Sequence, residues 1–285
     1  MRTITVAARA TVSPMTEARE YILGTDDVEL QRLGLQHQVW VSQQWRMLER
    51  AGLRAGHAVL DLGCGPGFTT FELAHVVGPN GRVVARDTSA RFLRHLQHEA
   101  KRRGMTQIET SEGTAEELAL PNASLDAAYS RWLLCWLPDP GRALRAVARA
   151  LRPGGFVMVQ EYLDWAAMKM IPRSAAFDRA VAACMRGWEL GGGHIDVGER
   201  IPALAAECGL RVESFEPIAR AGAVGSPVWR WIESFHRTWL PRVVERALLA
   251  TDEMQRLFAE YDTRNDSGDG RLCAPTMVDI VLRRP

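Results

Sequence analysis

The stretch that decides the fold is Val59-Leu60-Asp61-Leu62-Gly63-Cys64-Gly65-Pro66-Gly67. Its first half closes a short apolar run, residues 58–62, and its second half is a glycine-rich turn before a helical pattern over residues 69–77. A short apolar run bounded by turn residues is typical of a buried strand in a parallel sheet. Glycine lets the backbone come close to a ligand where a Cβ would collide. The stretch therefore predicts a strand, a ligand-binding turn and a helix.

The same alternation of strand and helix continues along the chain. Further strands are predicted at residues 81–85, 107–110, 125–129, 156–162, 210–215 and 276–282, and helices at residues 89–103, 140–151 and 201–208. Repeated strand–helix units imply strands that run parallel with helices on both faces. We therefore expect an α/β fold with a Rossmann-like, doubly wound, mostly parallel seven-stranded sheet.

The remaining segments are expected to be mainly helical. Residues 15–53 place apolar side chains at helical spacing, and residues 164–189 and 227–261 are also helical in pattern. A polar loop is predicted at residues 263–270, before the last strand.

Composition excludes several classes of protein. The 285 residues are 47% hydrophobic and 24% charged with a net charge of +1, which gives no general attraction to nucleic acid or to an acidic membrane. No apolar run is long enough to span a bilayer, and the first residues lack the apolar core of a secretory signal. The five cysteines are scattered without CxxC spacing, so we expect neither a disulfide framework nor a metal site. We expect a cytoplasmic location, where cysteines stay reduced.

Two acidic residues indicate what the glycine turn binds. Asp61 ends the first strand, where it would repel the pyrophosphate of a dinucleotide and attract an ammonium group. The spacing GxGxG also differs from the GxGxxG of dinucleotide sites. Asp87 ends the second strand, where a carboxylate can accept both hydroxyls of a ribose. The alternative role for Asp87 is to cap the start of the next helix. Because Asp87 follows the glycine turn at the spacing of a nucleoside site, the ribose-binding role is favoured.

Four segments together resemble the successive motifs of class I S-adenosylmethionine-dependent methyltransferases, in that family's order and spacing. They are residues 61–67, Asp87 with Ser89, residues 112–118 and residues 151–155. The resemblance covers roughly residues 58–162, and residues 21–24 and 32–36 resemble the lid helix of bacterial small-molecule members. It implies three regions: an N-terminal helical lid at 1–55, an S-adenosylmethionine-binding core at 56–162, and the remainder of the sheet with inserted helices forming the acceptor side at 163–285.

The resemblance also implies which residues contact the cofactor, S-adenosyl-L-methionine. Asp61 and the Gly63 backbone would face the methionine ammonium, in a turn shaped with Cys64, Gly65 and Gly67. The other implied contacts are Asp87 at the ribose, Thr88, Thr114 and Ala115 at the adenine, Ser130 and Arg131 at the methionine end, and Tyr21 and Gln36 over the carboxylate.

Two residues depart from the family's pattern. Thr114 stands where the family often has an aspartate, so its hydrogen bond to adenine would be a neutral one. Arg86 stands where a small or apolar residue commonly precedes the ribose acid. We expect Arg86 either to pair with Asp87 or to point into solvent.

The methyl acceptor is less constrained by sequence. Glu161 and Tyr162 end the fifth predicted strand and His194 lies on a glycine-rich loop, so these three are candidates for contacting the acceptor. The alternative for each is a polar residue at a strand end or loop tip that has no functional role. No catalytic residue is assigned, because methyl transfer depends mainly on alignment and needs a general base only for some acceptors. Most of the many large residues in the helical segments are expected to be ordinary core, but some could line an apolar acceptor pocket. This favours an aromatic or lipophilic small molecule, methylated at O, N or C.

Three other functions remain as alternatives. An arginine-rich face over residues 82–103 would serve an RNA methyltransferase, although the neutral chain makes nucleic acid a weaker candidate than a small-molecule partner. A non-catalytic S-adenosylmethionine-binding regulatory protein would bind the cofactor without turnover. An NAD oxidoreductase is opposed by Asp61 and by the spacing of the glycines. No membrane partner is expected, and a homodimer is left open beside a monomer.

Overall fold

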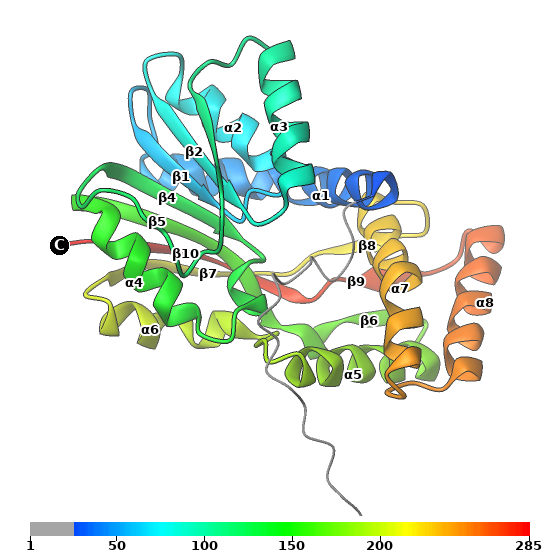
Figure 1. The fold of residues 1–285 in the computed structure, drawn as a ribbon. Helices are drawn as coiled ribbons and strands as arrows, with labels where there is room; N and C mark the ends of the chain where they lie inside the picture. The colour runs from blue at the N-terminus through cyan, green and yellow to red at the C-terminus, as the bar shows by residue number, and fades with distance from the viewer. Residues whose placement is uncertain (1–25) are drawn as a thin grey trace, which may run out of the picture.

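The computed structural model describes residues 26–285, so the predicted site residue Tyr21 lies outside the described part of the chain (Figure 1). Its centre is a seven-stranded sheet in the order β3-β2-β1-β4-β5-β10-β7. The strands in that order are β3 (Ile108–Glu112), β2 (Arg82–Asp87), β1 (Ala58–Leu62), β4 (Leu125–Arg131), β5 (Leu151–Asp164), β10 (Thr276–Arg283) and β7 (Arg211–Ile218). The first five pair in parallel, and β10 is antiparallel to both of its neighbours. The predicted doubly wound, mostly parallel sheet is confirmed.

Helices cover both faces of this sheet. The helices on one face are α1 (Asp27–Ala51), α2 (Phe68–Val77) and α3 (Ala90–Arg102), and those on the other are α4 (Pro140–Ala150) and α6 (Ile201–Glu207). Alternate strand residues serve the two faces: Val59 packs with α1 and α2, whereas Leu60 packs in the core shared with α4. This period of two in buried strands explains their continuous apolar sequence.

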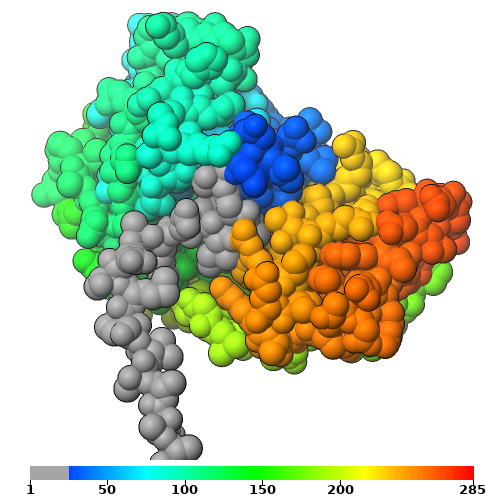
Figure 2. Space-filling view, turned by 45° about the vertical axis from the view of Figure 1, so that its right-hand side comes forward, coloured from blue at the N-terminus to red at the C-terminus, as the bar shows by residue number. Residues whose placement is uncertain are grey.

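A second unit, here called the cap, extends from the carboxyl end of β5. It contains a three-stranded antiparallel sheet, β6 (Lys169–Ile171), β9 (Arg271–Cys273) and β8 (Ala221–Ala223), with helices α5 (Ala175–Leu190), α7 (Pro227–Glu245) and α8 (Thr251–Ser267). Helix α1 packs along α7, and its first turn also pairs with α3 through Asp27 and Arg91. Figure 2 shows the start of α1 between the α2–α3 side of the core and α7.

The structure differs from the sequence-based expectations in several places. Strand β6 lies within residues 164–189, for which the sequence predicts mainly helix. The predicted loop at 263–270 is wrong, because α8 continues to Ser267 and ends at Gly268, whose φ is 71°. The helical stretch 227–261 is interrupted between α7 and α8, where Ala247 has a φ of 56°. Strand β5 begins at Leu151 and not at Phe156, because Leu151 already pairs with Leu125 of β4. The backbone of Gly154 and Gly155 also exchanges hydrogen bonds with that of Arg284.

Residues 26–285 contain neither a membrane-spanning helix nor a cluster of metal-binding side chains. None of the helices there combines the length and apolar content needed to cross a membrane. Histidine, cysteine, aspartate and glutamate side chains form no metal-binding group in the same residues.

Candidate functional site

The glycine turn lies at the carboxyl end of β1, between that strand and α2. A Cβ at Gly67, whose φ is 95°, would collide with the Leu96 side chain of α3, so only glycine fits beneath the turn. A Cβ at Gly65, whose φ is 54°, would meet no atom within 4 Å. Gly63 and Cys64 donate their amides to the Arg86 carbonyl, at 2.8 and 3.1 Å. The turn is therefore fixed from below and borders open space at Gly65.

Asp61 is a buried carboxylate at the base of this turn, only 2% exposed. The Thr70 hydroxyl of α2 donates to its Oδ2 atom at 2.6 Å. Loss of solvent around the group raises the pKa of Asp61 to about 7, while the Thr70 hydrogen bond and the positive charge of Arg131 act in the opposite direction. A cationic group placed beside Asp61 would stabilise its ionised form.

Asp87 ends β2 and faces the same turn. Its Oδ2 atom accepts from the Gly65 amide and its Oδ1 atom from the Ser89 amide, both at 2.8 Å. Burial raises the pKa of Asp87, and the amides of Ser89 and Gly65 lower it. Ser89 is the N-cap of α3, its hydroxyl accepting from the Phe92 amide at 3.2 Å. An ionised carboxylate has about four acceptor positions, so Asp87 can accept further hydrogen bonds.

The loop after β3, residues 113–118, carries the predicted adenine contacts. Ala115 is buried and Thr114 half-buried, while Thr88, across from them after β2, is exposed. The expectation for Arg86 is wrong on both counts. Its side chain neither pairs with Asp87 nor points into solvent but bonds to this loop, with Nε donating to the Thr114 carbonyl at 2.8 Å. Sequence reasoning missed this role because the partners are main-chain carbonyls, which leave no signal in residue type.

Helix α1 covers the end of β4, where Ser130 and Arg131 lie. Ser130 is buried and stands beside Leu62 in the β1–β4 pairing. Arg131 Nη2 lies 3.4 Å from Nδ1 of His37 on α1, and the His37 ring stacks on Phe68 with centroids 5.6 Å apart. Burial, the main cause, lowers the pKa of His37. Sequence analysis did not single out His37, which helical periodicity alone cannot distinguish from surface residues.

Gln36, predicted to close over the site, is buried on α1 beside His37. Its Oε1 atom accepts from Arg32 Nη1 at 2.9 Å, and Arg32 in turn pairs with Glu29 at 2.6 Å. All three side chains are buried, and they are spaced by one helical turn. With its oxygen committed to Arg32, Gln36 has its amide nitrogen available as a donor.

The three acceptor-side candidates lie around one short segment, the 3-10 helix Leu134–Trp136. Glu161 is fully buried on β5, and its Oε1 atom accepts from the amides of Leu133 and Leu134 at 2.9 and 2.7 Å. Burial raises the pKa of Glu161 to about 8, against the effect of these amides. The His194 amide donates to the Cys135 carbonyl at 2.8 Å. Glu161 and the His194 backbone therefore both fix the segment after β4.

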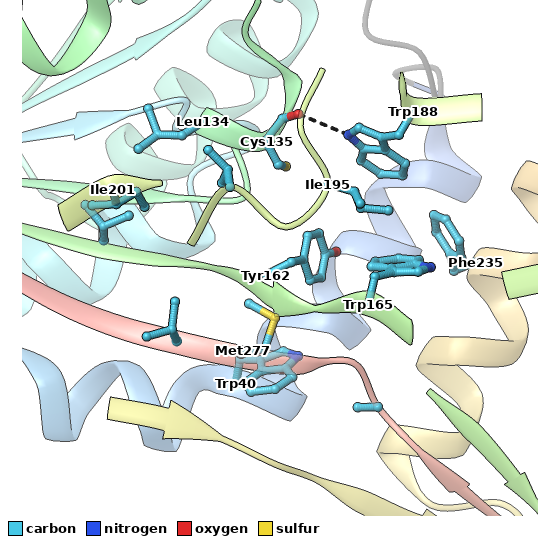
Figure 3. Close-up of a cluster of buried hydrophobic side chains, with 14 of the residues drawn as sticks. Trp40, Leu134, Cys135, Tyr162, Trp165, Trp188, Ile195, Ile201, Phe235 and Met277 are labelled. Carbon is cyan, nitrogen blue, oxygen red and sulfur yellow. Dashed lines mark hydrogen bonds between the residues drawn. The ribbon is translucent and has the colours of Figure 1, made fainter. Parts of the chain in front are cut away.

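Tyr162, the third candidate, belongs to an aromatic cluster between the end of the core sheet and the cap. The cluster comprises Trp132, Tyr162, Trp165, Trp188, Trp231 and Phe235. Figure 3 shows Tyr162 and Trp165 lying between Met277 on one side and Ile195 on the other, with Trp188 bonded to the Cys135 carbonyl at 3.1 Å. Trp132 follows Arg131 directly, stacks on Tyr162 at 5.9 Å and has a φ of 50°. Strained backbone of this kind persists where the surrounding structure holds it, often at functional sites.

The arginine-rich face over residues 82–103 is partly neutralised, because four of its arginines form ion pairs. Its ion pairs join Arg82 to Glu109, Arg91 to Asp27, and both Arg102 and Arg103 to Glu99. Paired charges project little positive field, so this face gives weak support to RNA binding.

The chain is similar in sequence to known methyltransferases. A family model described as a methyltransferase domain matches residues 60–159. The chain is 30% identical, over 155 residues, to a ubiquinone/menaquinone biosynthesis C-methyltransferase of Hahella chejuensis, covering 52% of this chain and 62% of that protein. The chain spans less than two thirds of the curated relatives it matches, and about half of most of them.

Solved structures share the fold at low sequence identity. A putative methyltransferase from Bacillus halodurans superposes with a TM-score of 0.60 at 17% identity, covering 86% of this chain and 99% of that one. A geranyl diphosphate methyltransferase in complex with SAM gives a TM-score of 0.56 at 15% identity, covering 90% of each chain.

Proposed function

We propose that this chain is a class I S-adenosylmethionine-dependent methyltransferase that transfers a methyl group from S-adenosylmethionine to O, N or C of a small aromatic or lipophilic molecule. The match of residues 60–159 to a methyltransferase-domain family model supports the proposal. The observation that carries the proposal is the placement of two carboxylates, the buried Asp61 and the half-buried Asp87, around a glycine turn that is open at Gly65. The proposal assigns residues 1–55 to a lid, 56–162 to the cofactor core and 163–285 to the acceptor side.

The residues around the turn fit the parts of the cofactor. Asp61, with its pKa near 7 and little solvent, would hold the methionine ammonium next to Gly63 and Cys64. Asp87 would accept the ribose hydroxyls with the oxygen positions not used by Gly65 and Ser89. The remaining proposed contacts are Gly65 and Gly67 along the turn, Thr88, Thr114 and Ala115 at the adenine, Ser130 and Arg131 at the methionine end, and Tyr21 and Gln36 above it.

When bound, S-adenosylmethionine would supply a methyl group on a cationic sulfur; an electron pair of the acceptor would form the new bond to the methyl carbon as the sulfur–methyl bond breaks and its electrons stay on sulfur. The chain's own contribution would be alignment of the two reactants and exclusion of water, effects worth up to about 7–11 kcal/mol in well-oriented systems. Glu161 would act by holding the backbone after β4, since its carboxyl is buried and already bonded to two amides. Tyr162 would face the acceptor as part of the aromatic cluster, with His194 on the loop beside it.

The aromatic cluster supports an apolar, planar acceptor. It lies directly after Ser130 and Arg131, the proposed methionine end, so a ring placed against Trp132 or Tyr162 would be near the transferred methyl group. The relative from Hahella chejuensis, named for C-methylation in quinone biosynthesis, favours a quinone-like ring carbon among the possible acceptors. The five cysteines are all unpaired, which suits a reducing, cytoplasmic compartment.

The proposal is tested by calorimetric titration of the protein with S-adenosylmethionine and S-adenosylhomocysteine, with NAD as the control ligand. We expect micromolar binding of both sulfur compounds and none of NAD, followed by methyl transfer to a quinone-like or other aromatic acceptor in a radiolabel screen. Absence of binding, or preference for NAD, would overturn the proposal. Binding without transfer to any acceptor would favour a regulatory protein, and salt-sensitive binding of RNA would favour RNA methylation.

A further inference from the structure

We propose that Arg86 is a positioning residue that holds residues 111–117, the end of β3 and the loop that follows it, in the shape required for the adenine end of the cofactor. The inference rests on the proposed function, since that loop carries Thr114 and Ala115. Arg86 itself is not proposed to touch the cofactor. Its side chain would act through the loop, and its backbone through the glycine turn.

The guanidinium of Arg86 is the centre of a set of hydrogen bonds to this loop. Nε donates to the Thr114 carbonyl at 2.8 Å, Nη1 to the Ser111 hydroxyl at 2.7 Å and, more weakly, to the Glu112 carbonyl at 3.4 Å. Nη2 donates to the Glu117 carbonyl at 3.1 Å. Four acceptors, two from the end of β3 and two from the loop after it, thus converge on one rigid planar group, which fixes their relative positions.

The environment of Arg86 shows that these bonds are its main interactions. The residue is 9% exposed, and no carboxylate among residues 26–285 forms an ion pair with it. A buried charge without an ion pair requires hydrogen bonds for its stability, and here three carbonyl oxygens and the Ser111 hydroxyl accept them. The loop and the guanidinium therefore hold each other in place.

Gly113 shows how closely the loop fits against this group. A Cβ added at Gly113, whose φ is 141°, would collide with Nη2 of Arg86. The Gly113 amide also donates to the Asp87 carbonyl at 3.0 Å, which ties the loop to the proposed ribose residue. A glycine is thus required at this position on both steric and conformational grounds.

Arg86 also supports the glycine turn, through its main chain. Its carbonyl accepts the Gly63 and Cys64 amides, while in the sheet it stands between Leu62 of β1 and Ser111 of β3. One residue therefore links the turn proposed for the methionine end with the loop proposed for the adenine end. Only the second link depends on the side chain, which makes the two links separable by substitution.

A preformed loop lowers the free-energy cost of binding, because the loop does not have to become ordered when the ligand binds. We expect Arg86→Met to weaken binding of S-adenosylhomocysteine by about tenfold or more, since hydrogen bonds from a charged donor are lost. Arg86→Lys should be intermediate, because an ammonium cannot reproduce the planar fork. Arg82→Met is the matched control, because Arg82 lies on the same strand. Its side chain is 41% exposed and, within residues 26–285, forms an ion pair with Glu109 alone, so its removal should leave binding unchanged.

Two measurements distinguish loop positioning from a general loss of structure. The first is amide hydrogen exchange of the ligand-free protein, in which Arg86→Met should expose peptides covering residues 111–117. Peptides covering Gly63 and Cys64 should stay protected, because the Arg86 carbonyl is retained. The second is calorimetry on Ser111→Ala, a milder variant that removes one acceptor of Nη1 and should weaken binding by a smaller factor.

The outcomes separate this inference from the proposed function. If the unmodified protein does not bind S-adenosylhomocysteine, the proposed function fails and the inference with it. If the unmodified protein binds but Arg86→Met binds equally well with an unchanged loop, the inference alone is wrong. Equal loss of protection in the loop, the glycine turn and the distant cap would also overturn it, since Arg86 would then be a general stabilising residue.

Discussion

The carboxylate of Asp87 accepts the amide proton of Gly65 at 2.8 Å, so the end of β2 holds the turn that follows β1. The two elements are adjacent in the sheet but distant in sequence. The same carboxylate accepts the Ser89 amide at the entry to α3. A single side chain thus fixes both the turn and the start of a helix. The same two hydrogen bonds also fix the direction of the acceptor positions that the carboxylate has left. Loss of Asp87 should affect both structure and binding.

Asp87→Asn should weaken binding of S-adenosylhomocysteine by about tenfold or more and lower the free energy of unfolding by about 1–3 kcal/mol. An amide has one oxygen, so it cannot accept from both Gly65 and Ser89 and from a ribose as well. Calorimetry and urea denaturation measure the two effects. Asp27→Asn, whose side chain is 88% exposed, is the control and should change neither. Unaltered affinity in Asp87→Asn would remove Asp87 from the proposed site.

Binding should depend on pH through Asp61. Its pKa in the free protein is raised from 3.8 to about 7, chiefly by burial, so the folded state binds more protons than the unfolded state between these values. The contribution of Asp61 to stability should therefore fall as pH rises from about 4 to about 7. Affinity for S-adenosylhomocysteine should rise over the upper part of that range, because an ionised Asp61 attracts its ammonium group.

Asp61→Asn isolates this effect from the other buried acids. The variant should bind S-adenosylhomocysteine weakly at every pH. It should also lack the fall in stability that Asp61 causes between about pH 4 and about pH 7. The measurement is the difference between the pH profiles of stability of the variant and of the unmodified protein. The difference is needed because the pKa of Glu161 is also raised and Glu161 contributes to both profiles. A parallel pH dependence in both proteins would show that Asp61 does not titrate with the ligand.

Substitutions of Glu161 should separate a structural role from a catalytic one. Glu161→Gln keeps an oxygen for the Leu133 and Leu134 amides and should unfold within about 1 kcal/mol of the unmodified protein. Glu161→Ala leaves two buried amides unpaired and should cost about 2–5 kcal/mol. Once an acceptor is found, retained turnover in Glu161→Gln is expected. Loss of turnover with normal stability would instead identify Glu161 as a general base.

Alanine at two glycines of the turn should give opposite results. Gly65→Ala places a Cβ in open space, so the protein should fold with a cost of about 1–2 kcal/mol from the left-handed backbone, but cofactor binding should be lost. Gly67→Ala drives a Cβ into Leu96 and should destabilise the fold itself. Thermal unfolding with calorimetry distinguishes them. Normal binding by Gly65→Ala would mean that the open space is not the cofactor site.

The core of the site was predictable because its signals are local. Asp61, the glycines and Asp87 lie at strand ends whose apolar patterns are clear, and parallel strands bring those ends to one edge. The structure brings Asp61, Asp87, Ser130 and Arg131 to the predicted edge of the sheet. Which of these residues contact a cofactor is still a prediction.

The parts that sequence reasoning missed depend on contacts between distant residues. Strands β6, β8 and β9 have three residues each, too few for any periodicity to appear. His37 is brought to Arg131 by the packing of α1, and Arg86 finds partners in main-chain carbonyls. The polar composition of residues 263–270 predicted a loop, but the helix continues because Leu257 and Tyr261 are anchored in the cap.

The placement of β10 between β5 and β7 has a consequence for folding during synthesis. Among the strands described, β7 pairs only with β10, which the ribosome makes much later, after α7 and α8. Until then β7 has no neighbour, and β5 exposes an unpaired edge to other nascent chains. The first five parallel strands can form earlier, so we expect a compact but incomplete intermediate that a chaperone would bind at the edge of β5.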